Sequence, residues 1–466
     1  MTSEALYGAV ARFAAATHGL PDWVLNNAAW SYEAYDGVRY AFLHTTLELR
    51  QLAVEIVAHR RDTGRPPTQG QYALRQHHAA FRDFEALLLN IEEKDFRRQP
   101  APHEWPVNVV LQHIHEVERY FFAAIRNTLL NPQPQALDDV DVAEMAGEPL
   151  QIPADVPLAE MWAGYARLHA KVQSELQSLT NEQLELRSPM WEPEPWPTVR
   201  FRLHRFDSHL REHANQLEKD LVLLDARPNE ARLLLRQMYA ALAEVEGVCI
   251  GDGGQSAKAC ANMAKIIDQR LASLQAVLPL IEAMIAAVSE GDRGAVETLL
   301  QQRPGLAYTV MEDELPAILF SQYRGRKDIV QALLASGMRL TMGEAAAVGE
   351  SERVRKIAKA WPGAVQDYTS DGFTPLQLAC FFGHAAIAAF LIDQGADIHA
   401  VARNAMQIQP LHAAVAGQYA DIVRLLIEHG ADVNARQQSG FTPLMAARQN
   451  NNKEIEALLL EAGAVA

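Results

Sequence analysis

From about residue 279 onward, short motifs recur at a nearly constant spacing, and this restricts what the C-terminal part of the chain can fold into. The first motif occurs three times, at intervals of 35 and 33 residues, as Thr374-Pro375-Leu376, Gln409-Pro410-Leu411 and Thr442-Pro443-Leu444. The second recurs at the same intervals as Gly395-Ala396-Asp397, Gly430-Ala431-Asp432 and Gly463-Ala464. Proline suits the first position of a helix and glycine the position after a helix ends. A period of this length predicts helix pairs that stack to bury a shared core.

The repeated unit resembles the ankyrin repeat. The stretch Asp371-Gly372-Phe373-Thr374-Pro375-Leu376, followed by Gly383-His384, fits that repeat closely. Weaker matches begin near Ile281, Glu312 and Met342, so we expect about six repeats over 279–466, the first three divergent. The resemblance implies a protein partner held by the concave face and the loop tips. The candidate contact residues are Phe381, Arg403, Arg436 and Gln437.

Three histidines form a second constellation in the first half of the chain. His209 and His213 are four residues apart, so a helix places both rings on one face, one turn apart. His113 falls on the apolar stripe of an earlier predicted helix, over 104–126, whereas His115 points away from that stripe. If the two helices pack side by side, three neutral imidazoles can share one metal ion and leave a coordination position open. His115 and His204 lie on other faces, and we expect them to be dispensable for the metal.

The residues around these histidines resemble the DinB superfamily. Trp105-Pro106-Val107 opens the helix and His113 follows eight residues after the tryptophan; the stretch 203–216 then carries the histidine pair and a glutamine three positions on. The resemblance covers roughly residues 70–250. It implies a metal-binding four-helix bundle, and some members of the family are transferases or isomerases that use a small thiol.

These patterns predict an all-α protein: a DinB-like four-helix bundle with extra N-terminal helices, followed by an ankyrin-repeat solenoid. The expected divisions are an N-terminal helical extension over 1–69, the bundle over 70–250, a linker and connecting helix over 251–278, and the repeats over 279–466. Within the bundle we expect one helix over 72–96 and a solvated acidic loop over 131–157. Four glycines make 247–255 look like a hinge between domains.

The chemistry at the three histidines stays open between alternatives. A site with an open position can lower the pKa of a water or hold a thiolate. Arg205, one turn before His209, is a candidate anchor for an anionic substrate group. The first hypothesis is a metal-dependent, thiol-using transferase carried to a protein partner by the repeats. The second is a binding module without catalysis, whose metal is structural, and the third is a metal-dependent hydrolase. Zinc, nickel and iron all suit imidazole, so the residues do not choose among them.

The amino-acid composition restricts which kinds of partner the protein is expected to bind. The net charge of −16 argues against binding to nucleic acid, which requires clustered lysine and arginine. The sequence has no unbroken apolar run of the length a membrane span needs, and its first residues lack a signal-peptide pattern. The three cysteines, Cys249, Cys260 and Cys380, are scattered and indicate no disulfide framework. We therefore expect a cytoplasmic protein without membrane contact. These features are also compatible with a homodimer.

Overall fold

The computed structural model describes residues 3–32, 35–131, 133–147, 152–153, 155–190, 194–438 and 440–465. The chain divides into two compact units. The first unit comprises Met1–Leu25 and Arg39–Leu274, and the second comprises Asn26–Val38 and Gln275–Ala466. The boundary near residue 274 lies within the predicted linker and connecting helix over 251–278, whereas the glycine-rich stretch 247–255 lies inside the first unit.

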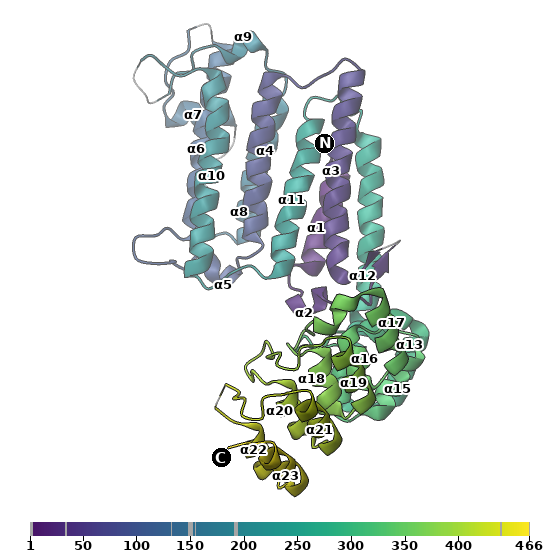
Figure 1. The fold of residues 1–466 in the computed structure, drawn as a ribbon. Helices are drawn as coiled ribbons and strands as arrows, with labels where there is room; N and C mark the ends of the chain where they lie inside the picture. The colour runs from purple at the N-terminus through teal and green to yellow at the C-terminus, as the bar shows by residue number, and fades with distance from the viewer. Residues whose placement is uncertain are drawn as a thin grey trace. The chain divides into compact units, whose positions relative to one another are not determined.

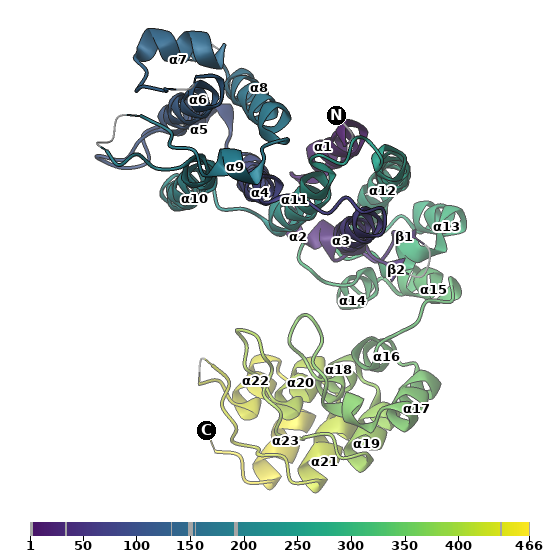
Figure 2. The same cartoon turned by 90° about the horizontal axis from the view of Figure 1, so that it is seen from above.

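A bundle of four long helices forms one part of the first unit (Figures 1 and 2). Its members are α4 (Gln69–Leu88), α6 (Val107–Leu130), α8 (Leu158–Leu176) and α10 (Val199–Leu223). α10 packs against both α4 and α6, and α8 packs against α4 and α6. Apolar side chains spaced three or four residues apart fill the interior, as on Phe81, Phe84 and Leu88 of α4. The predicted four-helix bundle is thus present.

The other helices of the first unit pack beside this bundle. They are α1 (Glu4–Thr17), α2 (Asp22–Leu25), α3 (Val38–Asp62), α11 (Glu230–Cys249) and α12 (Ala257–Glu290). α11 packs along α4 and also contacts α1. The rings of Phe13 and Phe42 meet edge to face at 5.1 Å between α1 and α3. The N-terminal helices therefore share a core with the helices that follow the bundle.

Two local predictions in the bundle are corrected. The helix predicted over 72–96 ends at Leu88, and a separate short helix, α5 (Glu93–Phe96), follows. The Asn90 side-chain amide donates to the Leu87 carbonyl at 2.9 Å, which competes with continuation of the helix. Phe96 is nevertheless fully buried. The apolar pattern over 72–96 therefore reports which side chains are buried and does not require one unbroken helix.

The acidic segment over 131–157 also contains a helix, α7 (Asp139–Ala146). Asp138 and Asp141 form a capping box at its start, and Gly147 ends it with a positive φ of 67°. Residues 132, 148–151 and 154 of this segment lie outside the described residues. A further short helix, α9 (Asn181–Leu184), precedes α10.

α12 is the one described helix that is long and apolar enough, by length and composition alone, to cross a membrane. It runs through Pro279 to Glu290, beyond the predicted end at residue 278. Ile267, Leu271 and Leu274 on one of its faces are buried in the first unit.

The second unit is a series of short antiparallel helix pairs (Figure 2). Its helices are α13 (Arg293–Gln302), α14 (Ala317–Tyr323), α15 (Lys327–Ala335), α16 (Met342–Val348), α17 (Ser351–Ala360), α18 (Pro375–Phe382), α19 (Ala385–Asp393), α20 (Pro410–Gly417), α21 (Ala420–Glu428), α22 (Pro443–Gln449) and α23 (Lys453–Glu461). Two 3₁₀ turns, η1 (Pro304–Tyr308) and η2 (Pro362–Gln366), follow α13 and α17. The strands β1 (Ser31–Tyr32) and β2 (Tyr35–Asp36) pair antiparallel. With only this short pairing between strands in the described residues, the predicted all-α class is confirmed.

The repeated motifs act as helix start and stop signals. Thr374 and Gln377 form a capping box around Pro375, the first residue of α18. Gly383 ends that helix in the left-handed conformation, with φ of 82°. Neighbouring first helices of the pairs, such as α18 and α20, pack directly on one another. The sequence period therefore corresponds to one stacked helix pair.

Candidate metal centre

Two helices bring the three predicted histidines together in the first unit. His113 comes from α6, and His209 and His213 lie one turn apart on α10. The Nε2 atoms of His113 and His209 are 3.3 Å apart. One ring nitrogen from each of the three lies within 4.8 Å of those of the other two. Donors around a four-coordinate ion bound at about 2.0–2.1 Å have a similar spacing.

The three rings lie at the edge of the bundle interior. His209 is 5% exposed, whereas His113 and His213 are partly open to solvent. The indole of Trp105 meets the His113 ring at a centroid distance of 5.2 Å and is itself 43% exposed. Phe121 approaches His209 from the interior side, at 6.0 Å. The arrangement thus has an apolar floor and a side open to small molecules.

Hydrogen bonding favours a metal-binding tautomer of His213. Its Nδ1 atom lies 3.0 Å from Oε1 of Gln216 and therefore donates a proton to that oxygen. The Nε2 lone pair of His213 then stays free to act as a ligand. Within the described part of the chain, Nδ1 of His209 is buried without a hydrogen-bond partner. A shared cation at the Nε2 atoms would give the nitrogens that face one another the partner that buried polar atoms require.

The surroundings favour the neutral form of two of these imidazoles, those of His113 and His209. Burial lowers the pKa of His209 to about 3, helped by the positive charge that His213, His113 and Arg205 can carry. Burial also lowers the pKa of His113, with a further contribution from His213. Because only the neutral imidazole offers a lone pair to a metal, the donor set fits a divalent transition ion.

Arg205 lies beside the triad, as predicted, but part of its charge is already engaged. Its guanidinium donates to Oγ of Ser208 at 3.0 Å and lies 3.6 Å from the Glu212 carboxylate. Its side chain is 34% exposed. Arg205 precedes His209 by four residues on α10, which places the two side chains on the same face of the helix. A role as substrate anchor remains a prediction.

The two histidines expected to be dispensable lie elsewhere. His204 is exposed on α10, and His115 is 1% exposed on the inward face of α6. Burial lowers the pKa of His115 to about 4, and its Nδ1 atom has no hydrogen-bond partner in the described part of the chain. Neither belongs to the group of ring nitrogens around His209.

Four acidic residues lie on the same two helices as the ligand histidines, namely Glu116, Glu118, Asp207 and Glu212. Asp207 accepts from Arg211 at 2.6 Å, and Glu118 binds residues of a separate network. The side chain that hydrogen-bonds the His213 ring is that of Gln216. Its place three positions after His213, on the same helix face, is the sequence signal that identifies it.

A second, buried histidine network lies between α4, α6 and α8. The carboxylate of Glu118 accepts from Tyr165 at 2.9 Å and lies 3.2 Å from Nε2 of His77. His77 Nε2 is 3.3 Å from Nδ1 of His169, whose Nε2 is 2.9 Å from Nδ1 of His78. Burial, and then the neighbouring His77, hold the pKa of His169 well below its usual value. The sequence analysis placed none of these residues in a network.

The network ends at an ion pair with α11. His78 Nε2 lies 2.8 Å from Glu246, which also accepts two hydrogen bonds from Arg82, at 2.7 and 2.8 Å. Because Glu246 accepts, His78 carries its proton on Nε2, and the same tautomer then follows for His169 and His77. Every imidazole in the row has a partner, so the network is complete without a metal and packs α4 against α8 and α11.

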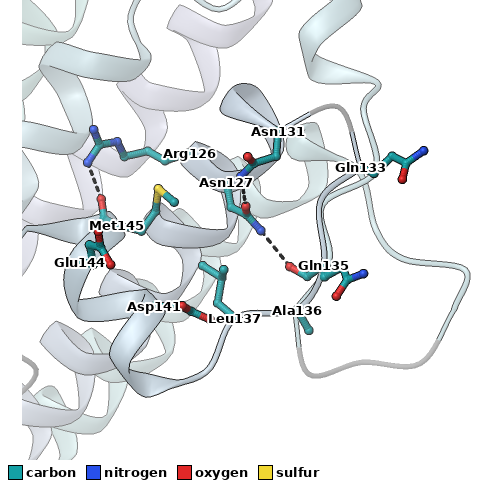
Figure 3. A pocket seen from close by; sticks show the side chains of 10 residues that line it. All are labelled: Arg126, Asn127, Asn131, Gln133, Gln135, Ala136, Leu137, Asp141, Glu144 and Met145. Atoms are coloured by element: carbon teal, nitrogen blue, oxygen red, sulfur yellow. Dashed lines mark hydrogen bonds between the residues drawn. The ribbon is translucent and has the colours of Figure 1, made fainter.

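One cavity of the first unit lies at the C-terminal end of α6, beside α7 (Figure 3). It has a volume of about 820 Å³. Its polar groups bind one another, as where Asn127 donates to the Gln135 carbonyl at 2.8 Å and Arg126 donates to the Met145 carbonyl. None of the three ligand histidines is among the described residues that line it. The cavity and the histidine site are therefore separate.

In the second unit, the structure separates the predicted partner-contact residues. Phe381 and Gln437 line one apolar cavity of about 440 Å³, together with Tyr323 and other residues. The Arg403 guanidinium instead stacks on the ring of Tyr368, 3.8 Å from its centroid. Arg436 contacts the Gly440 carbonyl at 3.4 Å. Neither arginine is among the described residues that line the cavity.

Comparisons with known proteins agree with both parts of the architecture. Residues 76–217 match the model of the DinB superfamily. Residues 283–402 and 400–465 match that of ankyrin repeats in three copies. The chain is 36% identical to Alpha-latrotoxin-Lg1a of Latrodectus geometricus over 93 residues, which are 20% of this chain and 7% of that protein. It is 35% identical to Rabankyrin-5 of Homo sapiens over 99 residues, 21% of this chain and 8% of that protein. The chain thus spans less than a tenth of either curated relative.

Proposed function

The chain joins a DinB-superfamily domain to an array of ankyrin repeats, and we propose that these two parts have different functions. The bundle binds one divalent transition ion through His113, His209 and His213. The repeats bind a protein partner and so bring the metal site to it. The activity we propose for the site is transfer of a small thiol to an electrophilic substrate.

The observation that carries the proposal is the 3.3 Å separation of the His113 and His209 Nε2 atoms, with His213 completing the group. Without a cation, His113 and His209 can share one hydrogen bond between their Nε2 atoms, but the Nε2 lone pair of His213 is then left over. A bound divalent ion would supply Lewis acidity at this position. Gln216 would hold His213 in the ligating tautomer, and Trp105 would form one wall of the site.

The open side of the site supports catalysis over a purely structural metal. His113 and His213 are partly exposed, so a small thiol and its acceptor can reach the rings. Arg205 adds a positive charge within one turn of His209, which suits a substrate that carries an anionic group. A structural ion would more often be enclosed by four protein ligands.

Metal analysis of the purified protein tests the site. We expect about one ion per chain in the wild type, as a three-histidine site requires. His113→Ala, His209→Ala and His213→Ala should each lose it, and His115→Ala and His204→Ala should keep it. Circular dichroism of every variant controls for folding. Retention of stoichiometric metal in all three ligand variants would overturn the proposal.

Activity assays separate the three alternatives. Thiol consumption in the presence of electrophiles, abolished by His209→Ala, supports the transferase. For Arg205→Ala we expect a higher KM for anionic acceptors with little change in metal content. Hydrolysis that needs the metal but no thiol would point to a hydrolase. Metal removal that unfolds the bundle, with no turnover at any stage, would support a structural ion.

Partner binding by the repeats requires a separate test. Proteins captured by the full chain should be lost when Phe381→Glu is combined with Arg403→Glu and Arg436→Glu. Gln437→Ala should weaken capture, because Gln437 lines the same cavity as Phe381. If the combined variant still captures every partner, this surface is not the binding face.

A further inference from the structure

Two cysteines that are far from any sequence motif meet inside the first unit. Cys249 is the last residue of α11, and Cys260 lies in the first turn of α12. Their Sγ atoms are 3.9 Å apart, in contact. Cys249 is 8% exposed and Cys260 is fully buried. Cys380, the third cysteine of the sequence, is a free cysteine buried in the second unit and is not part of this pair.

The loop between the two helices holds the thiols in this position. The Asp252 carboxylate accepts from the backbone N–H of Gly254 at 2.7 Å and of Ser256 at 3.0 Å. Arg60 donates to the carbonyls of Val248 and Ile250, at 2.6 and 2.9 Å. The chain on both sides of Cys249 is thus fixed by side-chain hydrogen bonds. The hydrogen-bonded loop between α11 and α12 therefore holds the two sulfurs close together, and their proximity does not depend on a flexible loop.

Close approach of another helix also fixes the turn. Gly251 has φ of +71°, and a Cβ atom there would lie 2.1 Å from the side-chain amide nitrogen of Gln71 on α4. Gln71 in turn accepts from Arg60 at 3.0 Å. The start of α4, the end of α3 and the turn before α12 therefore form one packed corner, with the two thiols inside it.

We propose that Cys249 and Cys260 are a redox-active pair, which hydrogen peroxide converts into a reversible disulfide within the first unit. Two thiols and one peroxide molecule give one disulfide and two molecules of water. The Cys260 sulfur attacks a peroxide oxygen, the O–O bond breaks, and one water leaves. The Cys249 sulfur then attacks the resulting sulfenic sulfur, the S–O bond breaks, and the second water leaves with the Cys249 proton.

The contact between the thiols supports this order of events. The hydrogen bond between the two thiols lowers the pKa of Cys260 and raises that of Cys249, which burial raises further. The sulfurs need to approach by about 2 Å to reach bonding distance, a movement that side-chain rotation supplies. The disulfide joins the end of α11 to the start of α12, and three residues before Cys249 lies Glu246, the partner of Arg82.

The test uses the native full-length chain, exposed to peroxide and then denatured in a thiol-blocking reagent. Free thiols should fall from three to one, and the intact mass should fall by about 2 Da, as disulfide formation requires. Peptide mapping should find Cys249 joined to Cys260. A dithiol reductant should restore all three thiols, and the oxidised protein should unfold at a higher temperature than the reduced one.

Matched variants identify the two sulfurs. Cys380→Ser should still lose two thiols to peroxide. In Cys249→Ser no disulfide should form, and a sulfenic-acid probe should label Cys260. If the wild type keeps its three thiols at peroxide doses that oxidise Cys260 in Cys249→Ser, the pair does not close. If the bond forms only after denaturation, or joins Cys380, the proposal is likewise overturned.

Discussion

The Nδ1 atom of His213 lies 3.0 Å from the Oε1 atom of Gln216, one turn further along the same face of α10. This hydrogen bond selects which ring nitrogen keeps the proton and which offers a lone pair. The Gln216 side-chain amide therefore holds His213 in the tautomer that can bind an ion, in the absence of the ion.

Replacing Gln216 should weaken metal binding without removing a ligand. We expect Gln216→Leu to bind zinc about 10- to 100-fold less tightly, because the His213 ring loses its orienting partner. Competition against a chelator of known affinity measures the change. Asn215→Leu, at the exposed neighbouring position, should bind zinc as the wild type does. Equal affinities for all three proteins would show that Gln216 has no such role.

Asp220 should reduce the stability of the first unit at neutral pH. It is fully buried, both carboxylate oxygens lack partners among the described residues, and burial followed by the nearby Glu104 raises its pKa to about 6. The folded state thus favours the protonated form, and stability is lost as the pH rises through about 6. We expect Asp220→Asn to raise the free energy of unfolding by as much as about 3 kcal/mol at pH 8. Urea titrations should find a smaller gain at pH 5; a gain that does not depend on pH would contradict this explanation.

The Arg82–Glu246 ion pair should be among the most sensitive contacts of the first unit. Burial alone would raise the pKa of Glu246, but Arg82 and His78 outweigh it and lower the pKa to about 2. Glu246→Gln leaves a buried guanidinium poorly compensated, so we expect a loss of about 3 kcal/mol in the free energy of unfolding.

A control for this prediction lies on the same helix. The Arg50–Glu244 pair is 3.6 Å apart and roughly half exposed, so Glu244→Gln should change stability by less than about 1 kcal/mol. The stabilisation from Glu246 is present above its unfolded pKa, near 4.5, and is lost as the pH falls towards 2. The difference between wild type and Glu246→Gln should therefore shrink in acid. Equal effects of the two substitutions at pH 7 would refute the prediction.

Gly417 should tolerate no side chain, because the array packs directly on it. A Cβ atom there would lie 2.4 Å from the Phe381 carbonyl oxygen and 2.8 Å from the ring of Tyr419. We expect Gly417→Ala to destabilise the second unit by about 1–3 kcal/mol through overpacking. Gly294→Ala, where the nearest atom is 3.5 Å away, is the control in the same unit and should not destabilise it. Thermal unfolding of the two variants provides the comparison.

Local signals were sufficient to predict much of this protein from its sequence. The repeat motifs specify their own helix starts and stops, as the capping box at Thr374 and the left-handed Gly383 illustrate. The spacing of His209 and His213 fixes their relation on any helix, because four residues make about one turn. His113 could be added from its place on an apolar stripe. Each of these inferences depends on residues within one turn or one repeat of each other.

Tertiary structure decided the features that join distant segments. The apolar pattern over 72–96 did not reveal that the helix ends at Leu88, since Phe96 is buried whether or not the helix continues. The glycines over 247–255 suggested a hinge between domains, yet they form a turn packed inside the first unit. No sequence spacing links His77 to His169, or indicates that Cys249 and Cys260 lie in contact. Such proximities depend on how helices pack around a common core, and packing is a property of the whole fold and not of any local segment.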